Sequence, residues 1–398
     1  MRISTAQIFK NGLTAIHDRQ VDLSRTQQQL ATGKRLLTPA DDPAASAQAL
    51  KLRERIASIE QYERNAEQAA TRLGQEEAVL VAIGDSLNRV RELAVQGANA
   101  TQTPESRLAI ARELRQILVG LLDAANSRAA NGEYLFAGHR SANQPFLVGP
   151  DGRVEYAGDD GQREIELAPG RRVAVGDSGS AFMTIPRGNG VFVVTPDAAN
   201  TGTGRVIDAE VVDRSQLTGE PYTIVMTAPD AYEVLDGDGN VVATGAYAAG
   251  QSIDIGGMRV VLDGEPAAGD SFRIEPGATT SIFAIVDELA EALEADVSTP
   301  GERALLTHRA TSALLDIDQA IDRVLELRTN VGARLNMIDS QTDVNADQTL
   351  DLTGALSRVE DLDYAEALSR YGLQLAALQA AQQTYAQVSR LSLFDWLK

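Results

Sequence analysis

Glycine and proline are distributed very unevenly along this 398-residue chain. Of its 33 glycines, 23 lie between Gly132 and Gly277, and nine of its 13 prolines lie in the same window. Both residues interrupt helices and favour turns, so the pattern predicts helical flanks around a turn-rich β region. The predicted fold class is α+β and multidomain: a long antiparallel helical bundle or coiled coil from both chain ends, with an inserted, mainly β outer domain.

The N-terminal flank begins with a sparse seven-residue hydrophobic repeat, formed by Phe9, Ile16, Leu23 and Leu30 and supported by Leu13. This period is typical of a coiled coil, but Gln20 and Gln27 interrupt the seam, so the helix is marginal by itself. Gly33 is expected to end the helix in the left-handed conformation. Asp42 and Pro43 are expected to start the next one.

Further capping signals divide the flanks into long helices. A break is predicted at Gly97, and Thr103 is expected to cap the following helix. Thr299 and Glu302 form a capping box before the most regular heptad stretch of the chain. The last apolar segment contains Tyr364, Leu368, Tyr371, Leu375, Leu378, Tyr385, Val388, Leu391, Phe394 and Trp396. Terminal residues usually fray, so an aromatic tail indicates docking against a partner.

The middle of the chain predicts strands. Seven candidates are residues 191–194, 206–212, 222–226, 241–243, 253–255, 258–262 and 272–274. Before them, Val154–Tyr156 and Ile165–Leu167 flank the turn signal Gly158–Gly161, which predicts one hairpin from these two strands. Residues 170–280 carry 15 acidic and seven basic side chains, a net charge of −8, so an acidic, solvated surface is expected there.

Composition excludes several classes of function. The 36 basic and 56 acidic side chains give a net charge of −20, which opposes sequence-independent binding of nucleic acid. Cysteine is absent, which removes disulfides, thiol nucleophiles and cysteine zinc sites. No apolar run approaches the ~18 residues of a transmembrane helix. The segment Met1–Lys10 lacks the apolar core and cleavage site of a signal peptide.

Two short motifs resemble chemical sites without the necessary partners. Gly176–Gly179 resembles the nucleophile segment of trypsin-like proteases, but the three histidines lie in distant segments, so a strand-connecting turn is predicted. Asp236–Asn240 resembles the start of an EF-hand loop. Val241 and Tyr247 replace its required glycine and glutamate, so a type I′ hairpin turn is predicted. The chain is therefore expected not to be an enzyme and to have no catalytic, cofactor-binding or metal-binding residues.

Four segments resemble the signatures of bacterial flagellins and their relatives. Residues 30–44 and 89–96 match the N-terminal signatures, and residues 332–336 and 357–364 match the C-terminal ones. The four occur in the family's order at both ends, so the resemblance covers the helical flanks. Within the family, the chain resembles the hook–filament junction branch more than filament subunits. This finer resemblance rests on residues 1–5, 131–138, 144–146, 264–272 and 393–397.

The resemblance implies three structural parts. Residues 1–42 and 358–398 would form an inner coiled-coil domain that is disordered in the monomer. Residues 43–168 and 279–357 would form a helical-bundle domain with a β-hairpin at about 132–168, and residues 169–278 a β-rich outer domain. The apolar residues of the two terminal helices would be the assembly interface and would fold as they bury one another. Subunit stacking is implied for Arg89, Leu93 and Glu113.

The implied function is structural, at the junction between hook and filament. The implied partners are hook-associated protein 1, flagellin, copies of the same chain in a ring, the flagellar type III export apparatus and an export chaperone, without nucleic acid, membrane insertion or a cofactor. The implied location is the extracellular flagellum, reached without a cleaved signal peptide. Two alternatives remain open: a filament flagellin and, from another class, a secreted adhesin that binds through its β region.

Overall fold

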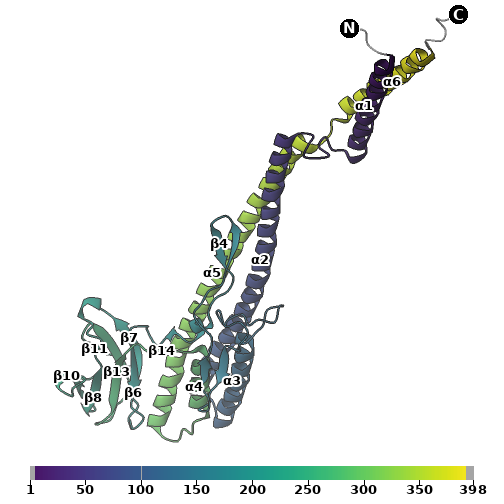
Figure 1. The fold of residues 1–398 in the computed structure, drawn as a ribbon. Coiled ribbons are helices and arrows are strands. Elements are labelled where there is room, and N and C mark those ends of the chain that lie inside the picture. Colours follow the sequence, from purple (N-terminus) through teal and green to yellow (C-terminus); the bar gives the residue numbers. More distant parts are fainter. Residues whose placement is uncertain (1–4, 100, 391–398) are drawn as a thin grey trace, which may run out of the picture. The chain divides into compact units, whose positions relative to one another are not determined.

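The structure is a computed structural model that describes residues 5–99 and 101–390. The chain forms two compact units, Met1–Arg64 with Ser340–Lys398, and Asn65–Asp339. The long helices α2 (Pro43–Gly97) and α5 (Pro300–Glu360) contribute to both units, so the division falls within helices. Helical flanks around a central β region confirm the predicted α+β class (Figure 1).

The first unit is built from α1 (Thr5–Thr32), α6 (Tyr364–Arg390), the first part of α2 and the last part of α5. Two predicted helix ends are confirmed in it. Gly33 has a φ of 69°, the left-handed conformation that ends α1. Oδ1 of Asp42 accepts the N–H of Ala45 at 3.0 Å, so Asp42 caps α2.

The second unit contains a helical bundle of α3 (Pro104–Ala125), α4 (Ile282–Glu294) and the remaining parts of α2 and α5. Their inward faces share one buried cluster. Its members include Leu73, Leu80, Ile83, Leu87 and Val90 of α2, Leu114 of α3, Phe283 of α4, and Ile317, Val324 and Val331 of α5. The predicted caps are present here too: Thr103 accepts from Ser106, and Thr299 and Glu302 bond reciprocally at 2.7 and 3.2 Å.

Helix α4 is an element that the sequence analysis does not predict. Oγ of Ser281 caps it by accepting the N–H of Ala284 at 3.0 Å. Eight of its 13 residues are buried, Phe283 and Leu289 among them. In the longer helices an apolar face alternates with a polar one, and this contrast predicts a helix. In a short helix with so wide an apolar face the contrast is missing, and the same apolar run can also form a buried strand.

Two small hairpins pack on the bundle and correct the predicted pairing. β1 (Phe146–Val148) pairs with β2 (Val154–Tyr156), and β3 (Glu164–Ala168) pairs with β4 (Arg171–Ala174), both antiparallel. The predicted hairpin between 154–156 and 165–167 is therefore wrong, because these strands belong to different hairpins. Both strands have turn residues on each side, so local pattern alone does not choose the partner.

The outer part of the second unit is an antiparallel β-sandwich. One sheet has the order β10–β9–β8–β13–β6 and the other β11–β12–β7. The strands are β6 (Phe192–Pro196), β7 (Arg205–Val211), β8 (Tyr222–Ala228), β9 (Ala231–Leu235), β10 (Val241–Ala246), β11 (Ser252–Ile255), β12 (Met258–Asp263) and β13 (Ser271–Pro276). All seven predicted strands are present, and β9 is additional. Alternate residues, such as Met258, Val260 and Leu262, form a core distinct from that of the helices.

The chain enters and leaves the sandwich through a paired stalk. β5 (Ile185–Pro186) pairs with β14 (Thr279–Thr280), and the N–H of Arg187 donates to the carbonyl of Ala278 at 3.0 Å. The sandwich is thus inserted between two neighbouring points of the bundle, as the glycine and proline distribution predicts.

The loop Asp236–Asn240 joins β9 to β10 and corrects the predicted turn type. The Asp236 carboxylate accepts the N–H groups of Asp238 and Asn240 at 3.0 and 2.8 Å, and Gly239 has a φ of 84°. A type I′ turn needs positive φ at both central residues, and no non-glycine residue in the described ranges has one. The hairpin is present, but its turn is not type I′.

None of the described helices combines the length and hydropathy that a membrane crossing requires.

Candidate assembly surfaces

Helices α1 and α6 form an antiparallel pair. A Cβ atom placed on Gly12 would lie 3.0 Å from Cδ2 of Tyr385, and one on Gly33 would lie 2.7 Å from the hydroxyl of Tyr364. The first contact joins the start of α1 to the end of α6, and the second joins the end of α1 to the start of α6. The described ends of the chain therefore lie together at one end of the pair (Figure 1).

The seam of this pair mixes small and polar side chains with larger apolar ones that are mostly half-buried. The less exposed positions of α6 recur at spacings of three and four residues: Ala367, Tyr371, Gln374, Leu378, Ala381 and Tyr385. On α1, Thr26 and Gln29 are buried. Among the described large apolar side chains of the two helices, only that of Leu378 is buried, at 8% exposure. The pair therefore gains little hydrophobic stabilisation from its own seam.

The structure divides the predicted interface residues between two faces. Buried or half-buried are Ile16, Leu23, Leu30, Tyr371, Leu378 and Tyr385. Exposed are Leu13, Tyr364, Leu368 and Leu375, at 59%, 53%, 58% and 38%. Phe9 and Val388 lie within α1 and α6, without a described side chain, and Leu391, Phe394 and Trp396 lie outside the described residues.

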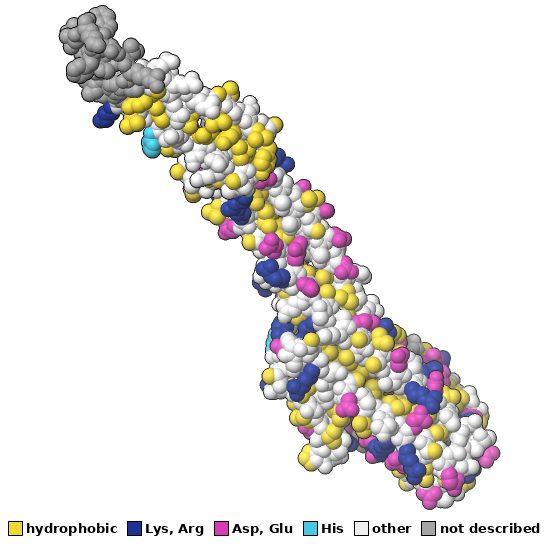
Figure 2. All heavy atoms as spheres, turned by 90° about the vertical axis from the view of Figure 1, so that its right-hand side faces the viewer, with side chains coloured by type: hydrophobic (Ala, Val, Ile, Leu, Met, Phe, Trp, Pro, Cys, Tyr) yellow, Lys and Arg dark blue, Asp and Glu magenta, His cyan; other side chains and the backbone are white. Residues whose placement is uncertain are grey.

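Further exposed apolar residues of the first unit were not among the predicted site residues. They are Val21 on α1, Leu373 on α6, Leu50 on α2 and Leu350 on α5, with exposures of 53%, 71%, 65% and 73%. In the sequence, these residues can be recognised as apolar residues that lie outside the three- and four-residue spacing of the seam. Figure 2 shows hydrophobic side chains gathered over the visible face of the terminal helices. Exposed apolar surface of this extent is typical of an interaction surface.

A clamp of hydrogen bonds between residues 33–35 and 360–362 holds the end of α1 next to the start of α6. The N–H of Arg35 donates to the carbonyl of Glu360 at 2.7 Å, and the N–H of Leu362 donates to that of Gly33 at 2.9 Å. The Glu360 carboxylate is buried and accepts from Lys34 at 3.1 Å and from Arg53 at 2.6 Å. These charge-assisted bonds to a buried carboxylate hold the segment after α1 and the segment before α6 in one geometry.

The three residues implied in subunit stacking have different environments. Arg89 on α2 is exposed and bonds to Glu113 on α3 and to Glu92 on its own helix, at 2.8 and 2.7 Å. Both carboxylates raise the pKa of the Arg89 guanidinium. Leu93 is 1% exposed and belongs to the core of the bundle. Arg89 and Glu113 can therefore present charge to a neighbouring subunit, whereas Leu93 has no surface to offer in this conformation.

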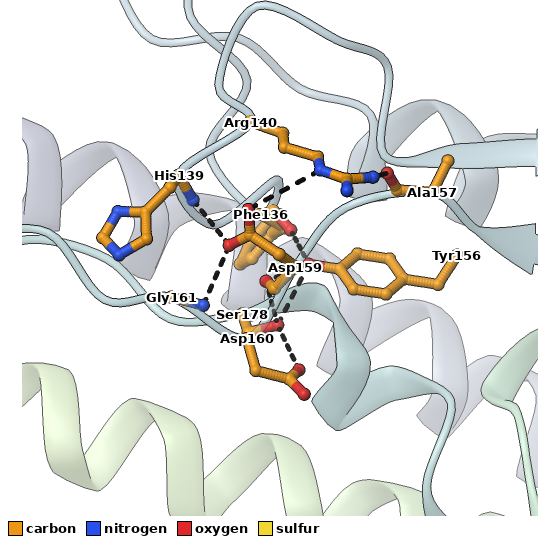
Figure 3. Close-up of polar contacts among 9 residues, drawn as sticks. All are labelled: Phe136, His139, Arg140, Tyr156, Ala157, Asp159, Asp160, Gly161 and Ser178. Atoms are coloured by element: carbon orange, nitrogen blue, oxygen red, sulfur yellow. Dashed lines mark hydrogen bonds and ion pairs between the residues drawn. The ribbon is translucent and has the colours of Figure 1, made fainter.

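The protease-like segment around Ser178 is a structural hydrogen-bond cluster (Figure 3). The Ser178 hydroxyl bonds to the hydroxyl of Tyr156 and the carbonyl of Asp159, both at 3.0 Å, and caps a 3₁₀ turn at Gly179–Phe182. The Asp159 carboxylate accepts the backbone N–H of His139 at 2.8 Å, not its ring, which points away from Ser178. Burial raises the pKa of Tyr156.

This arrangement lacks the hydrogen-bonded base that activates a serine nucleophile. The segment Gly176–Gly179 connects β4 to the 3₁₀ turn, not to another strand. In the ranges that the structure covers, no group of three or more His, Asp or Glu side chains lies close enough to hold a metal ion. The arrangement of polar groups around Ser178 therefore serves to fold residues 136–182 onto the bundle.

Comparison with family models and known relatives identifies the family of this chain. The model of the bacterial flagellin N-terminal helical region matches residues 3–141, and that of the C-terminal helical region matches residues 314–397. Together they span more than half of the chain and confirm the resemblance that the sequence signatures carry.

Relatives of two kinds match along nearly the whole chain, since a flagellin of Clostridium tyrobutyricum, 24% identical, covers 98% of it. The chain is 24% identical over 398 residues to flagellar hook-associated protein 3 of Escherichia coli K12, and the match covers 100% of both chains. The structure of FlgL from Xanthomonas campestris is 36% identical, with a TM-score of 0.73, over 77% of this chain and 99% of that one. The flagellar junction protein FlgL from Legionella pneumophila is 32% identical, with a TM-score of 0.72, over 79% and 100%. The chain belongs to the bacterial flagellin family.

Proposed function

We propose that this chain is a structural component of the bacterial flagellum and forms part of the junction between hook and filament. The observation that carries the proposal is its full-length similarity to hook-associated protein 3, together with its likeness to FlgL structures, one of which is named a flagellar junction protein. The alternative within the same family is a filament flagellin, and the experiment below distinguishes the two. The proposed role is non-enzymatic.

The proposed mechanism is folding coupled to assembly. Of the described large apolar side chains of α1 and α6, only that of Leu378 is fully buried, while Leu13, Val21, Leu368 and Leu373 stay exposed. Isolated amphipathic helices of this kind are marginal in water. We therefore expect residues 1–42 and 358–398 to be disordered in the monomer and to fold when neighbouring subunits cover these apolar side chains.

The proposed partners follow from this position in the flagellum. They are hook-associated protein 1 on the hook side, flagellin on the filament side and further copies of this chain in a ring. Delivery would use the flagellar type III export apparatus, with a chaperone covering the C-terminal helix before export. The exposed Leu368 and Leu375, two turns apart on one side of α6, supply an apolar face for such a chaperone. The mature location would be the extracellular flagellum.

The experiment that tests the junction is deletion of the gene in its own host. We expect hooks without filaments, with unpolymerised flagellin in the culture medium, because export would continue without a base for the filament. Complementation with the unchanged gene should restore filaments. Loss of the filament without flagellin in the medium would identify the chain as the filament subunit. Normal filaments would overturn both flagellar roles and favour the secreted adhesin.

A further inference from the structure

Two carboxyl groups are buried side by side in the second unit, away from the assembly surfaces. The side chain of Glu76 on α2 is 0% exposed, and that of Asp177, in the segment after β4, is 6% exposed. Oε1 of Glu76 accepts the backbone N–H of Asp177 at 3.0 Å. Oε2 of Glu76 is buried and has no hydrogen-bond partner among the described residues.

The nearest cation on α5 is committed to the other carboxylate. Arg334 donates through both terminal nitrogens to the two oxygens of Asp177, at 3.0 and 2.7 Å. Gln162 donates to Asp177 as well, at 2.9 Å. Asp177 is therefore fully satisfied as an anion, and its negative charge stays next to Glu76.

The cation on α2 itself is also committed elsewhere. Arg72 donates to the carbonyls of Val175 and Tyr134, at 2.9 and 3.2 Å, and to Glu133 at 3.2 Å. Arg163 lies beyond it and pairs with Glu133 at 2.5 Å. The charged groups that face Glu76 are thus Arg72, Arg334 and Asp177, and none directs an N–H at its second oxygen.

We propose that Glu76 carries a proton in the folded protein, and that this proton locks residues 158–182 onto the helical bundle so that its loss releases the segment. A buried carboxyl without a donor for its second oxygen is stable in the neutral form and costly in the charged form. Burial first, and then the charge of Asp177, raises the pKa of Glu76 to about 8.

Release would relieve the cost of ionisation by letting water reach Glu76. The segment also buries Leu167, Val173 and Phe182 in the core of the bundle, so its opening would expose apolar surface there. Because the opened segment lets Glu76 ionise at its ordinary pKa, the lock is strongest in acid and weakens as pH rises from about 4.5 to about 8. The proposal does not depend on the function proposed above, because every group involved lies within one subunit.

Hydrogen–deuterium exchange of the full chain tests the lock at the Asp177 amide. We expect its protection factor, corrected for the intrinsic exchange rate, to fall by up to tenfold per pH unit between about pH 4.5 and about pH 8 and to level off above this range. This slope corresponds to opening with release of one proton. A protection factor that stays constant from about pH 4.5 to about pH 8 overturns the proposal.

Two matched variants assign the effect to Glu76. Glu76→Gln keeps an oxygen for the Asp177 N–H and cannot ionise, so protection should no longer depend on pH. Glu77→Gln removes the neighbouring carboxylate, which bonds to Arg328 of α5 at 2.9 Å, and should keep the pH profile of the unchanged chain. A pH dependence that survives in Glu76→Gln, or disappears in Glu77→Gln, contradicts the assignment.

Infrared spectroscopy keeps the test decisive if Glu76→Gln does not fold. At neutral pH the unchanged chain should show the carbonyl band of one protonated carboxylic acid, because exposed carboxyl groups are ionised there. The band should vanish as pH rises through about 8, where the fall in the protection of Asp177 ends. Its absence from the folded chain at neutral pH would refute the proton lock.

Discussion

Ser281 shows how a single hydroxyl sets the start of an element that the sequence analysis does not identify. It caps α4, is 8% exposed and accepts the N–H of Ala284 at 3.0 Å. Ser281→Ala should lower the free energy of unfolding of the second unit by about 1 kcal/mol, because a partly buried N–H loses its acceptor. Thermal or urea unfolding measures the change.

Ser86→Ala is the matched control for this prediction. Ser86 is exposed in α2, and its hydroxyl bonds only to the carbonyl of Ala82 in the same helix, at 2.8 Å. Alanine is the better helix former, so this variant should be neutral or slightly stabilising. Equal losses in both variants would mean that the Ser281 cap makes no specific contribution.

Glu76 also predicts a pH dependence of global stability. Its pKa is about 8 in the folded protein, against 4.5 for an ordinary glutamate. Between these values the folded chain holds a proton that the unfolded chain has released, so stability falls as pH rises through this window. The difference in free energy of unfolding between the unchanged chain and Glu76→Gln should therefore shift against the unchanged chain from about pH 4.5 to about pH 8. Urea unfolding across this range measures it, and a constant difference would contradict the prediction.

At the scale of elements, α6 shows what the sequence can and cannot predict. The caps and glycine breaks are local signals, and they predict the end of α1, both ends of α2 and the starts of α3 and α5 correctly. The seam of α6 alternates the predicted Tyr371, Leu378 and Tyr385 with Ala367, Gln374 and Ala381, whose small or polar side chains give too little hydrophobic contrast to be predicted. The predicted Leu368 and Leu375 lie on the exposed surface of α6, and their part in the assembly interface stays a prediction.

The two faces of α6 predict separate effects of alanine substitutions. Leu378→Ala removes the buried side chain of the seam, and Leu373→Ala removes a side chain that is 71% exposed. Both should reduce incorporation into flagella, the first by weakening the helix pair by about 2 kcal/mol and the second by removing apolar contact with a neighbour. Gln382→Ala, also exposed on α6, should incorporate normally. Quantitative blotting of purified flagella measures incorporation.

Unfolding of the monomer separates assembly from folding in the same variants. None of the three substitutions should move the thermal transition of the second unit, because all lie in the first. A loss of monomer helicity in Leu378→Ala would show that the helix pair already forms before assembly. That outcome would contradict the proposed disorder of the terminal segments.

At the scale of the whole molecule, the sandwich and the bundle have separate cores. The N–H of Arg187 and the carbonyl of Ala278 are 3.0 Å apart, so a short glycine–serine linker can replace residues 188–277. The remaining chain should keep its helical circular dichroism and a cooperative thermal transition, lowered by a few °C because Asp316 loses the N–H of Gly188. The excised segment should fold alone as a β protein.

Deletion of residues 134–182 is the contrasting variant. Phe136, Phe146 and Phe182 of this stretch belong to the core of the bundle, so its removal should abolish the cooperative transition. Retention of the transition in this variant, or its loss in the first, would contradict the division into two cores.

The order of elements along the chain follows from glycine, proline and capping residues, whereas strand partners and exposed faces depend on long-range packing. Val154–Tyr156 illustrates the first limit, because its partner is β1 and not the next strand along the chain. Leu93 illustrates the second, because an apolar residue in a family signature can lie in the core or at a contact: the structure gives it 1% exposure, and its part in subunit stacking stays a prediction. Local sequence holds neither piece of information.

The antiparallel pairing of α1 and α6 makes the first helix depend on the last. Gly12 meets Tyr385, so the earliest described helix has no partner until nearly the whole polypeptide is present. A chain cut short anywhere upstream of α6 leaves α1 alone, however well the bundle and sandwich have folded. Closure of this pair therefore requires completeness: when subunits assemble, an intact chain can close the pair and a truncated one cannot.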